Sequence, residues 1–296
     1  MTVREQPPLV DVHGHFLHEL CGRSDWAERN AHRVARGDDI GITIHIASIL
    51  GSWGQTSPTY FPSPDDATLG NKAMRRIAGE HPGKVFAYTT VNPNFTKHAL
   101  REIEAGEGDE TVGIKLAASR RASDTLLDPI CELAAHIHAP ILQHIWQHRR
   151  GEVPGQEISD ALDLVDLADR HPDCQLILAH IGGGGDWAHS LRALVDVPNV
   201  WVDLSGSGVD RGMLELCLEC AGPGRLLWGT DLTMDTGLAK LRALRHIGLS
   251  PEDLEKIRWK NAASIFKLPL PGGGPRTTAP TGVRGKTARV RAIRSS

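Results

Sequence analysis

Four histidines and one aspartate stand at the ends of apolar segments, where they could form one site. His13 and His15 lie two residues apart in Val-Asp-Val-His-Gly-His, and residues spaced in this way point to the same side of a strand. His144, His180 and Asp231 each end or follow a later apolar segment. Three or four neutral imidazoles with one carboxylate form a ligand set that suits Zn²⁺ and also Fe²⁺, Mn²⁺ or Co²⁺. The residue types and their spacing therefore predict a divalent-metal site.

The alternative for any single member of this set is ordinary packing. A lone histidine at the end of a strand is usually a polar residue whose hydrogen bonds are satisfied. Burying four imidazoles and a carboxylate together, without a metal or another partner, would cost several kcal/mol. The whole group thus favours a metal site, although no member would do so alone.

Eight short apolar segments, which could position these residues, alternate with amphipathic segments of helix length. The expected strands are residues 9–12, 42–49, 85–89, 112–116, 140–144, 176–180, 200–204 and 226–228. Strict alternation of strands and helices predicts a parallel sheet covered by helices, and eight such units predict closure into a barrel. We therefore expect an α/β fold, a (β/α)8 TIM barrel, over residues 1–268. Residues 269–296 would form a basic, disordered tail.

Helix boundaries can be read from the sequence in two places. Asp65 and Asp66 open a helix that ends near Gly79, before a His-Pro pair. Ser159 opens another that ends at His171, again before proline. Acidic or hydroxyl residues at the start and proline after the end are typical helix boundaries.

Closure of the barrel would bring the histidines and Asp231 to one mouth, at the C-terminal ends of the strands. Barrels of this type place their active sites at that face. Two long connections, residues 51–66 and 145–158, follow the second and fifth strands at the same face. Loops of this length usually cover a site or are disordered.

The ordered set resembles the amidohydrolase superfamily, within it the amidohydrolase-2 branch that includes aminocarboxymuconate-semialdehyde decarboxylase-like proteins. The shared features are His-x-His on strand one, histidines on strands five and six, and aspartate on strand eight. The segment Asn-Ala-Ala-Ser-Ile-Phe-Lys-Leu, residues 261–268, is similar to the closing helix of that branch. The resemblance covers residues 9–268 and implies the barrel fold.

The resemblance also implies roles for the site residues. His13, His15, His144 and Asp231 would bind one divalent metal per chain, with zinc expected first and Mn, Fe or Co as alternatives. His180 would orient and help to activate water at the metal, and Asp231 would accept a proton and pass it to the leaving group. A bound metal lowers the pKa of water towards 7, which allows such chemistry at neutral pH.

Lys115, near the end of the fourth strand, leaves two possibilities open. Binuclear members of the superfamily use a carboxylated lysine on this strand to bridge two metals. A lysine that points into a metal site must lose its charge, pair with an acid or be modified. In the alternative, Lys115 binds a substrate carboxylate or pairs with Asp231. We expect one metal, with Lys115 as a ligand only if it is carboxylated and the site is binuclear.

Several polar and aromatic residues near the mouth are candidates for substrate binding. Arginines could bind a carboxylate and tryptophans could line an apolar or aromatic substrate, although exposed arginines and packed tryptophans are common without a ligand. The candidates are Trp53, Asn92, Arg120, Trp146, His148 and Arg149.

These features predict a metal-dependent hydrolase that cleaves an amide, lactone or ester bond of a small, carboxylated molecule. The alternative is a nonoxidative decarboxylase on the same scaffold, which releases CO₂ without consuming water. A hydratase is a third reading. A barrel that serves only as a binding or scaffold module would be expected to lack some of the metal-binding residues. Here every position that matches a metal-binding residue of the family is filled.

Charge and cysteine content limit the partners and the compartment. The chain has 33 basic and 36 acidic residues, but the last 21 residues contain six basic and no acidic ones. The remainder is therefore acidic, which argues against a nucleic-acid partner. No apolar segment is long enough to span a membrane. Five scattered cysteines suit reduced thiols in the cytoplasm. A small-molecule substrate and a homodimer are the expected partners.

Overall fold

The computed structural model describes residues 7–50, 61–106, 108, 110–146, 157–183, 185–206, 208–231 and 234–270. Three of the expected substrate-binding residues, Trp53, His148 and Arg149, lie outside these ranges. The expected tail lies outside them from residue 271 onward.

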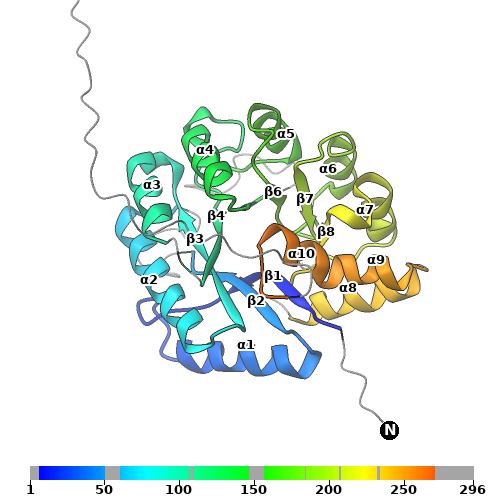
Figure 1. Cartoon of the computed structure of the whole chain (residues 1–296), viewed down its shortest axis with the longest axis horizontal. Helices are drawn as coiled ribbons and strands as arrows, with labels where there is room; N and C mark the ends of the chain where they lie inside the picture. Colours follow the sequence, from blue (N-terminus) through cyan, green and yellow to red (C-terminus); the bar gives the residue numbers. More distant parts are fainter. Residues whose placement is uncertain are drawn as a thin grey trace, which may run out of the picture.

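Eight parallel strands follow one another around the sheet in chain order, with each strand paired to the next (Figure 1). The strands are β1 Val10–His15, β2 Ile44–Ser48, β3 Val85–Val91, β4 Thr111–Leu116, β5 Ile141–Gln143, β6 Leu176–Leu178, β7 Val200–Asp203 and β8 Leu226–Leu227. The last strand meets the first through two backbone hydrogen bonds, from Val12 N–H to Trp228 O at 3.1 Å and from Asp231 N–H to His13 O at 2.6 Å. The expected (β/α)8 barrel is confirmed.

Eight helices follow the eight strands and cover the outside of the barrel (Figure 1). They are α1 Trp26–Ile40, α2 Pro64–Glu80, α3 Thr96–Ala105, α4 Asp128–Ile137, α5 Ala161–Arg170, α6 Trp187–Ala193, α7 Met213–Ala221 and α8 Met234–His246. Short 3₁₀ turns at Pro93–Phe95, Thr125–Leu127 and Pro223–Arg225 lie in the connections. The described chain ends with α9 Pro251–Glu255, a π-helical turn Lys256–Lys260 and α10 Asn261–Ile265.

Two helix starts differ by one or two residues from the sequence-based expectation. α2 begins at Pro64, and Ser63 caps it by accepting a hydrogen bond from Asp66 N–H while the Asp66 side chain accepts from Ser63 N–H. α5 is capped by Asp160, not by Ser159. The Ser159 hydroxyl instead accepts a hydrogen bond from Ala122 N–H at 2.8 Å. Ser159 and Asp160 are both typical capping residues, so the sequence does not show which of them caps α5 and which binds a neighbouring loop.

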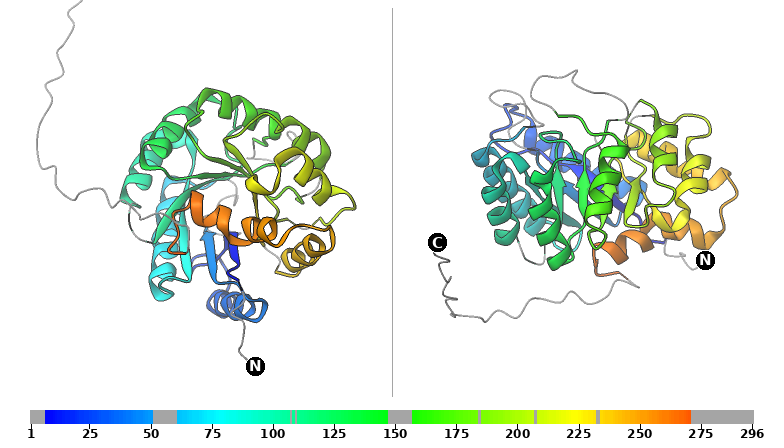
Figure 2. Two further views of the ribbon diagram at one scale, coloured as in Figure 1. Left: turned by 45° about the vertical axis from the view of Figure 1, so that its right-hand side comes forward. Right: turned by 90° about the horizontal axis from the view of Figure 1, so that it is seen from above.

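Apolar residues fill the barrel interior and α10 closes its N-terminal end. The interior residues include Val10, Ile44, Leu142 and Ile177, which pack in one cluster with residues of the closing segment. The ring of Phe266 meets that of Tyr88 edge to face, with centroids 5.8 Å apart. Asn261 donates hydrogen bonds to Leu226 O and Pro223 O, each at 2.8 Å. The closing helix therefore lies across one end of the barrel, which leaves the other end for the site (Figure 2).

Within the described ranges, no helix is both long enough and apolar enough to cross a membrane.

Candidate metal centre

Three of the predicted ligands meet at the mouth of the barrel, at the point where β1 approaches the segment after β8. The expected first strand continues to His15, so that both histidines of the His-x-His pair lie within β1. Asp231 follows β8 and forms an isolated parallel bridge with Gly14. The Nε2 atoms of His13 and His15 lie 3.7 Å and 3.2 Å from Asp231 Oδ1. Within the described part of the chain, these three side chains are the group that could hold a metal ion, with ligand atoms all within 4.8 Å of one another.

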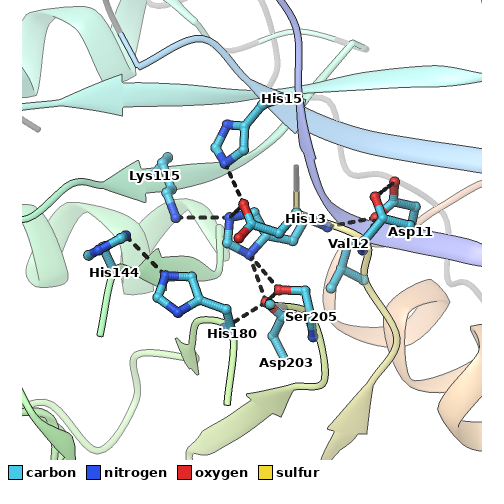
Figure 3. Close-up of polar contacts among 12 residues, drawn as sticks. Asp11, Val12, His13, His15, Lys115, His144, His180, Asp203 and Ser205 are labelled. Atoms are coloured by element: carbon cyan, nitrogen blue, oxygen red, sulfur yellow. Dashed lines mark hydrogen bonds and ion pairs between the residues drawn. The ribbon is translucent and has the colours of Figure 1, made fainter. Parts of the chain in front are cut away.

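The Nδ1 atoms of His13 and His15 each have a polar partner that orients the ring. His13 Nδ1 lies 2.7 Å from Asp203 Oδ2, as Figure 3 shows. His15 Nδ1 lies 3.1 Å from the hydroxyl of Ser48. When Nδ1 carries the proton, Nε2 has a free lone pair and can bind a metal. Both rings are therefore held with Nε2 towards Asp231.

The surroundings of the histidines and of Asp231 favour the protonation states that bind a metal. Burial lowers the pKa of His15 and of His180 to about 4 each, and burial also holds the pKa of His144 well below its usual range. Burial alone would raise the pKa of Asp231, but the neighbouring His13 and His15 hold it well below its usual range. Neutral imidazoles and an ionised carboxylate are the forms that coordinate a divalent cation. The donor set therefore fits a metal before any metal binds.

Lys115 adds a buried amine to the same site. It is fully buried on β4, and its Nζ lies 3.3 Å from His13 Nε2. Burial lowers the pKa of Lys115 to about 8, although the negative charges of Asp231 and Asp203 favour its ammonium form. The lysine expected on strand four thus lies beside the ligands, where a carboxylated form could bridge two metals and an ammonium could face an anion.

His144 and His180 form a second pair beside the three ligands. His144 Nδ1 lies 3.0 Å from His180 Nε2, and the two rings meet edge to face. The ring of His180 also stacks on that of His13, with centroids 5.7 Å apart. In Figure 3 all of these rings turn towards one region. His144 is outside the group within 4.8 Å, so its role as the fourth ligand stays a prediction.

The backbone at His180 differs from the expected strand. β6 ends at Leu178, because His180 has a φ of 41°, which an extended strand does not allow. Residues other than glycine rarely adopt this left-handed conformation. The turn is held by Asp203 Oδ2, which accepts from His180 N–H at 2.9 Å, and by Gly183 N–H, which donates to His180 O at 2.7 Å.

The described substrate-binding candidates have partners within the protein. Asn92 is buried, donates to Pro62 O at 2.9 Å and accepts from Asn94 N–H at 3.0 Å. Arg120 bonds to Glu157 and Asn94 and lies 3.4 Å from Asp124. The ring of Trp146 lies 5.5 Å from that of His144, next to the predicted ligands. Their contact with substrate stays a prediction, as it does for Trp53, His148 and Arg149.

Two buried carboxylates that hold the site together, Asp203 and Asp11, are not among the residues predicted from the sequence. Asp203, the last residue of β7, binds His13, and its only sequence signal is its place at the end of an apolar strand. Asp11 accepts hydrogen bonds from Thr230 N–H at 2.9 Å and from His13 N–H at 3.2 Å. It also pairs with Arg33 at 3.2 Å. Asp11 therefore connects the backbones of both segments that carry ligands.

Comparison with known proteins shows the family of this chain. A sequence model of the Amidohydrolase family (amidohydrolase-2) matches residues 10–268. The chain belongs to the amidohydrolase-2 family. The expected resemblance is confirmed, and the match includes both the strands that carry the predicted ligands and the closing helix. Among curated proteins, no sequence matches the chain significantly.

Solved structures with the same fold include several decarboxylases. A 2,6-dihydroxybenzoate decarboxylase from Rhizobium is 17% identical, with a TM-score of 0.69, over 89% of this chain and 99% of that one. A 5-carboxyvanillate decarboxylase from Sphingomonas paucimobilis is 16% identical, with a TM-score of 0.65, over 89% of this chain and 100% of that one. A dihydroxybenzoic acid decarboxylase from Polaromonas, which holds bound manganese, is 17% identical over 89% and 98%, with a TM-score of 0.68. At these identities the likeness shows the fold.

Proposed function

We propose that this amidohydrolase-2 protein is a metal-dependent, nonoxidative decarboxylase of a carboxylated aromatic acid. The observation that carries the proposal is the convergence of His13, His15 and Asp231 on one point, with the amine of Lys115 buried beside them. A divalent metal held there, together with the ammonium of Lys115, would supply positive charge that suits a substrate carrying a carboxylate. The solved structures of the same fold support decarboxylation over the hydrolysis that the sequence analysis put first.

We assign the metal to His13, His15 and Asp231, with His144 as the fourth ligand. A divalent metal bound there would supply a Lewis acid that holds an anionic oxygen of the substrate. Manganese is the first metal to test, in place of zinc, because a neighbour of this fold holds it. One metal is proposed, with Lys115 as an unmodified amine whose charge complements the substrate.

His180 is proposed to hold and deliver the proton that the reaction needs. In decarboxylation, the ring carbon that bears the carboxylate gains a proton, and its bond to the carboxylate carbon breaks with release of CO₂. Burial lowers the pKa of His180 to about 4, so the imidazole is neutral at rest, and once protonated beside an anionic substrate it would be a strong acid. His144 Nδ1, 3.0 Å from His180 Nε2, is a hydrogen-bond partner that orients the ring.

Hydrolysis of an amide, lactone or ester is the second candidate, because the family is named for this chemistry and the same donor set suits both reactions. The two reactions differ in their products. Hydrolysis consumes water, and every carbon of the substrate stays in the products. In decarboxylation the substrate loses one carbon as CO₂.

The test is turnover of 2,6-dihydroxybenzoate and 5-carboxyvanillate in D₂O by the Mn²⁺-loaded protein. The proposal predicts release of CO₂ and one deuterium on the ring carbon that bore the carboxylate, as read by NMR. The His180→Ala variant should release little CO₂. Turnover of lactones or amides, with neither aromatic acid consumed, would favour hydrolysis instead.

We also propose a small-molecule substrate, a cytoplasmic location and a homodimer for this chain. All five cysteines are buried and unpaired by disulfides, which suits a reducing compartment. Gel filtration with light scattering would test the dimer.

A further inference from the structure

Asp203 is a buried carboxylate that contacts the site from behind and has no role in the proposed reaction. It is the last residue of β7 and is fully buried. Oδ2 accepts from His13 Nδ1 at 2.7 Å, from His180 N–H at 2.9 Å and from the Ser205 hydroxyl at 2.5 Å. Oδ1 accepts from Ser205 N–H at 2.9 Å. One side chain therefore touches a proposed ligand, the backbone of the proposed proton donor and its own loop.

These contacts fix where the proton of His13 lies. An ionised carboxylate can only accept, so His13 Nδ1 must donate to Asp203. A neutral imidazole with the proton on Nδ1 has a lone pair on Nε2. The ammonium of Lys115, 3.3 Å from His13 Nε2, can only donate and therefore needs this lone pair. Two independent contacts thus select the tautomer that can bind a metal.

The same carboxylate fixes His180 relative to His13. The left-handed backbone of His180 is unfavourable unless its surroundings hold it. Asp203 supplies one of these restraints through the His180 N–H. Both hydrogen bonds are accepted by Asp203 Oδ2. This one atom therefore fixes the position of the His13 ring relative to the turn at His180.

The loop that carries Ser205 is itself held in place. Lys240 of α8 is fully buried, and its amine donates to Ser205 O at 2.8 Å and to Gly206 O. Gly182 N–H donates to Ser205 O at 3.2 Å, which joins this loop to the segment after His180. The donors around Asp203 are therefore ordered without any contribution from substrate.

We propose that Asp203 is a positioning residue that selects the metal-binding tautomer of His13 and holds His180 at a fixed place beside it. The inference deepens the proposed function and rests on it for the metal. In this proposal Asp203 is neither a metal ligand nor a proton donor, and it acts only through His13 and His180.

The experiment uses Asp203→Asn, which keeps the size of the side chain and removes its charge. Asp128→Asn is the matched control, because Asp128 accepts from His171 Nε2 at 2.8 Å on the outside of the barrel. The first readout is the tautomer of His13 in metal-free protein, from ¹⁵N NMR of histidine-labelled samples, with the signal assigned by a His13→Gln variant. The second is Mn²⁺ affinity, measured by competition with a chelator.

The proposal predicts that Asp203→Asn converts the single Nδ1–H form of His13 into a mixture of tautomers and weakens Mn²⁺ binding about 10- to 100-fold. It also predicts a larger fall in kcat than rise in KM, because the position of His180 is loosened. Asp128→Asn should change neither readout. An unchanged His13 signal together with Mn²⁺ affinity within about twofold of wild type would overturn the proposal.

Ser205→Ala keeps the test decisive if Asp203→Asn does not fold. It removes one donor to Asp203 and a hydroxyl that lies 3.1 Å from His13 Nδ1, and should weaken Mn²⁺ binding about two- to tenfold in the same direction. No change in this variant would contradict the proposal. If wild type does not bind Mn²⁺ at all, the proposed metal site fails, whereas the tautomer readout still decides whether Asp203 positions His13.

Discussion

His180 and Asp231 share a backbone feature that turns their side chains into the site. Their φ angles are 41° and 56°, which residues other than glycine rarely adopt. Asp231 is held by its N–H bond to His13 O, and His180 by its N–H bond to Asp203. Such conformations cluster at functional sites because the surrounding structure must maintain them. Both positions lie in the segments that follow β6 and β8, and the turn there directs the side chain to the mouth.

Substitution of His180 and of His144 should separate proton transfer from metal binding. His180→Ala is expected to lower kcat about 100- to 10,000-fold with unchanged Mn²⁺ content, because it removes a proton donor and not a ligand. His144→Ala is expected to lower the Mn²⁺ content. Steady-state rates and elemental analysis of both variants check this. Normal metal content in His144→Ala would remove it from the ligand set.

Lys115→Met tests whether the site holds one metal or two. A bridging carboxylated lysine would be required for a second metal, whereas an unmodified amine is not required for the first. We expect Lys115→Met to keep the wild-type metal content and to raise KM for a carboxylated substrate, since a positive charge is lost. Loss of one of two metals on substitution, seen by elemental analysis, would show that Lys115 is a bridging ligand.

Among the elements, β1 is tied to its neighbours by Asp11 as well as by apolar packing. The carboxylate of Asp11 contacts Arg33 of α1, His45 of β2 and Thr230 after β8. Burial alone would raise the pKa of Asp11, but hydrogen bonding to His45 and the charge of Arg33 hold it well below its usual range. The carboxylate is therefore ionised in the folded protein and stabilises the junction between both ligand-bearing segments.

Asp11→Asn should lower the free energy of unfolding at neutral pH by about 3 kcal/mol, because it leaves Arg33 without its buried partner. A depressed pKa in the folded state means that this contribution is present above the unfolded pKa, near 4, and is lost as the pH falls. The variant should therefore lose less stability than wild type on acidification, as measured by urea unfolding from pH 7 to pH 3. Asp39→Asn, at an exposed carboxylate paired with Arg36, should behave like wild type. Equal acid sensitivity of Asp11→Asn and wild type would contradict the assignment.

Packing of α1 against β2 depends on a glycine inside the helix. A Cβ on Gly37 would lie 2.4 Å from His45 Nε2, which is fully buried. Alanine favours a helix over glycine, so propensity alone predicts stabilisation. We expect Gly37→Ala to destabilise by about 1–3 kcal/mol because the ring of His45 must move. Gly79→Ala in α2, where a Cβ would meet nothing within 4 Å, should stabilise by about 0.5–1 kcal/mol. Thermal unfolding of both variants decides this, and the same sign for both would refute the steric argument.

At the scale of the whole molecule, the sequence was sufficient to predict the barrel, since strand and helix alternate with nearly constant spacing. It also predicted that His13, His15 and Asp231 converge, because strand ends in a closed barrel share one mouth. It did not predict that Asp203 would contact His13, since one aspartate at a strand end does not reveal a partner 190 residues away. Nor did it predict that Arg120 would bind Glu157, 37 residues further along, in place of projecting freely. Which side chains meet across loops depends on distances in space, and these cannot be read from the number of residues between them in the sequence.

The metal content of protein purified without added metal or chelator is the direct test of the proposed metal centre. Elemental analysis should find about one divalent metal per chain, held by His13, His15 and Asp231. Removal by a chelator should abolish turnover, and Mn²⁺ should restore it. Protein that contains no metal, and takes up none when titrated with Mn²⁺ or Zn²⁺, would contradict the account.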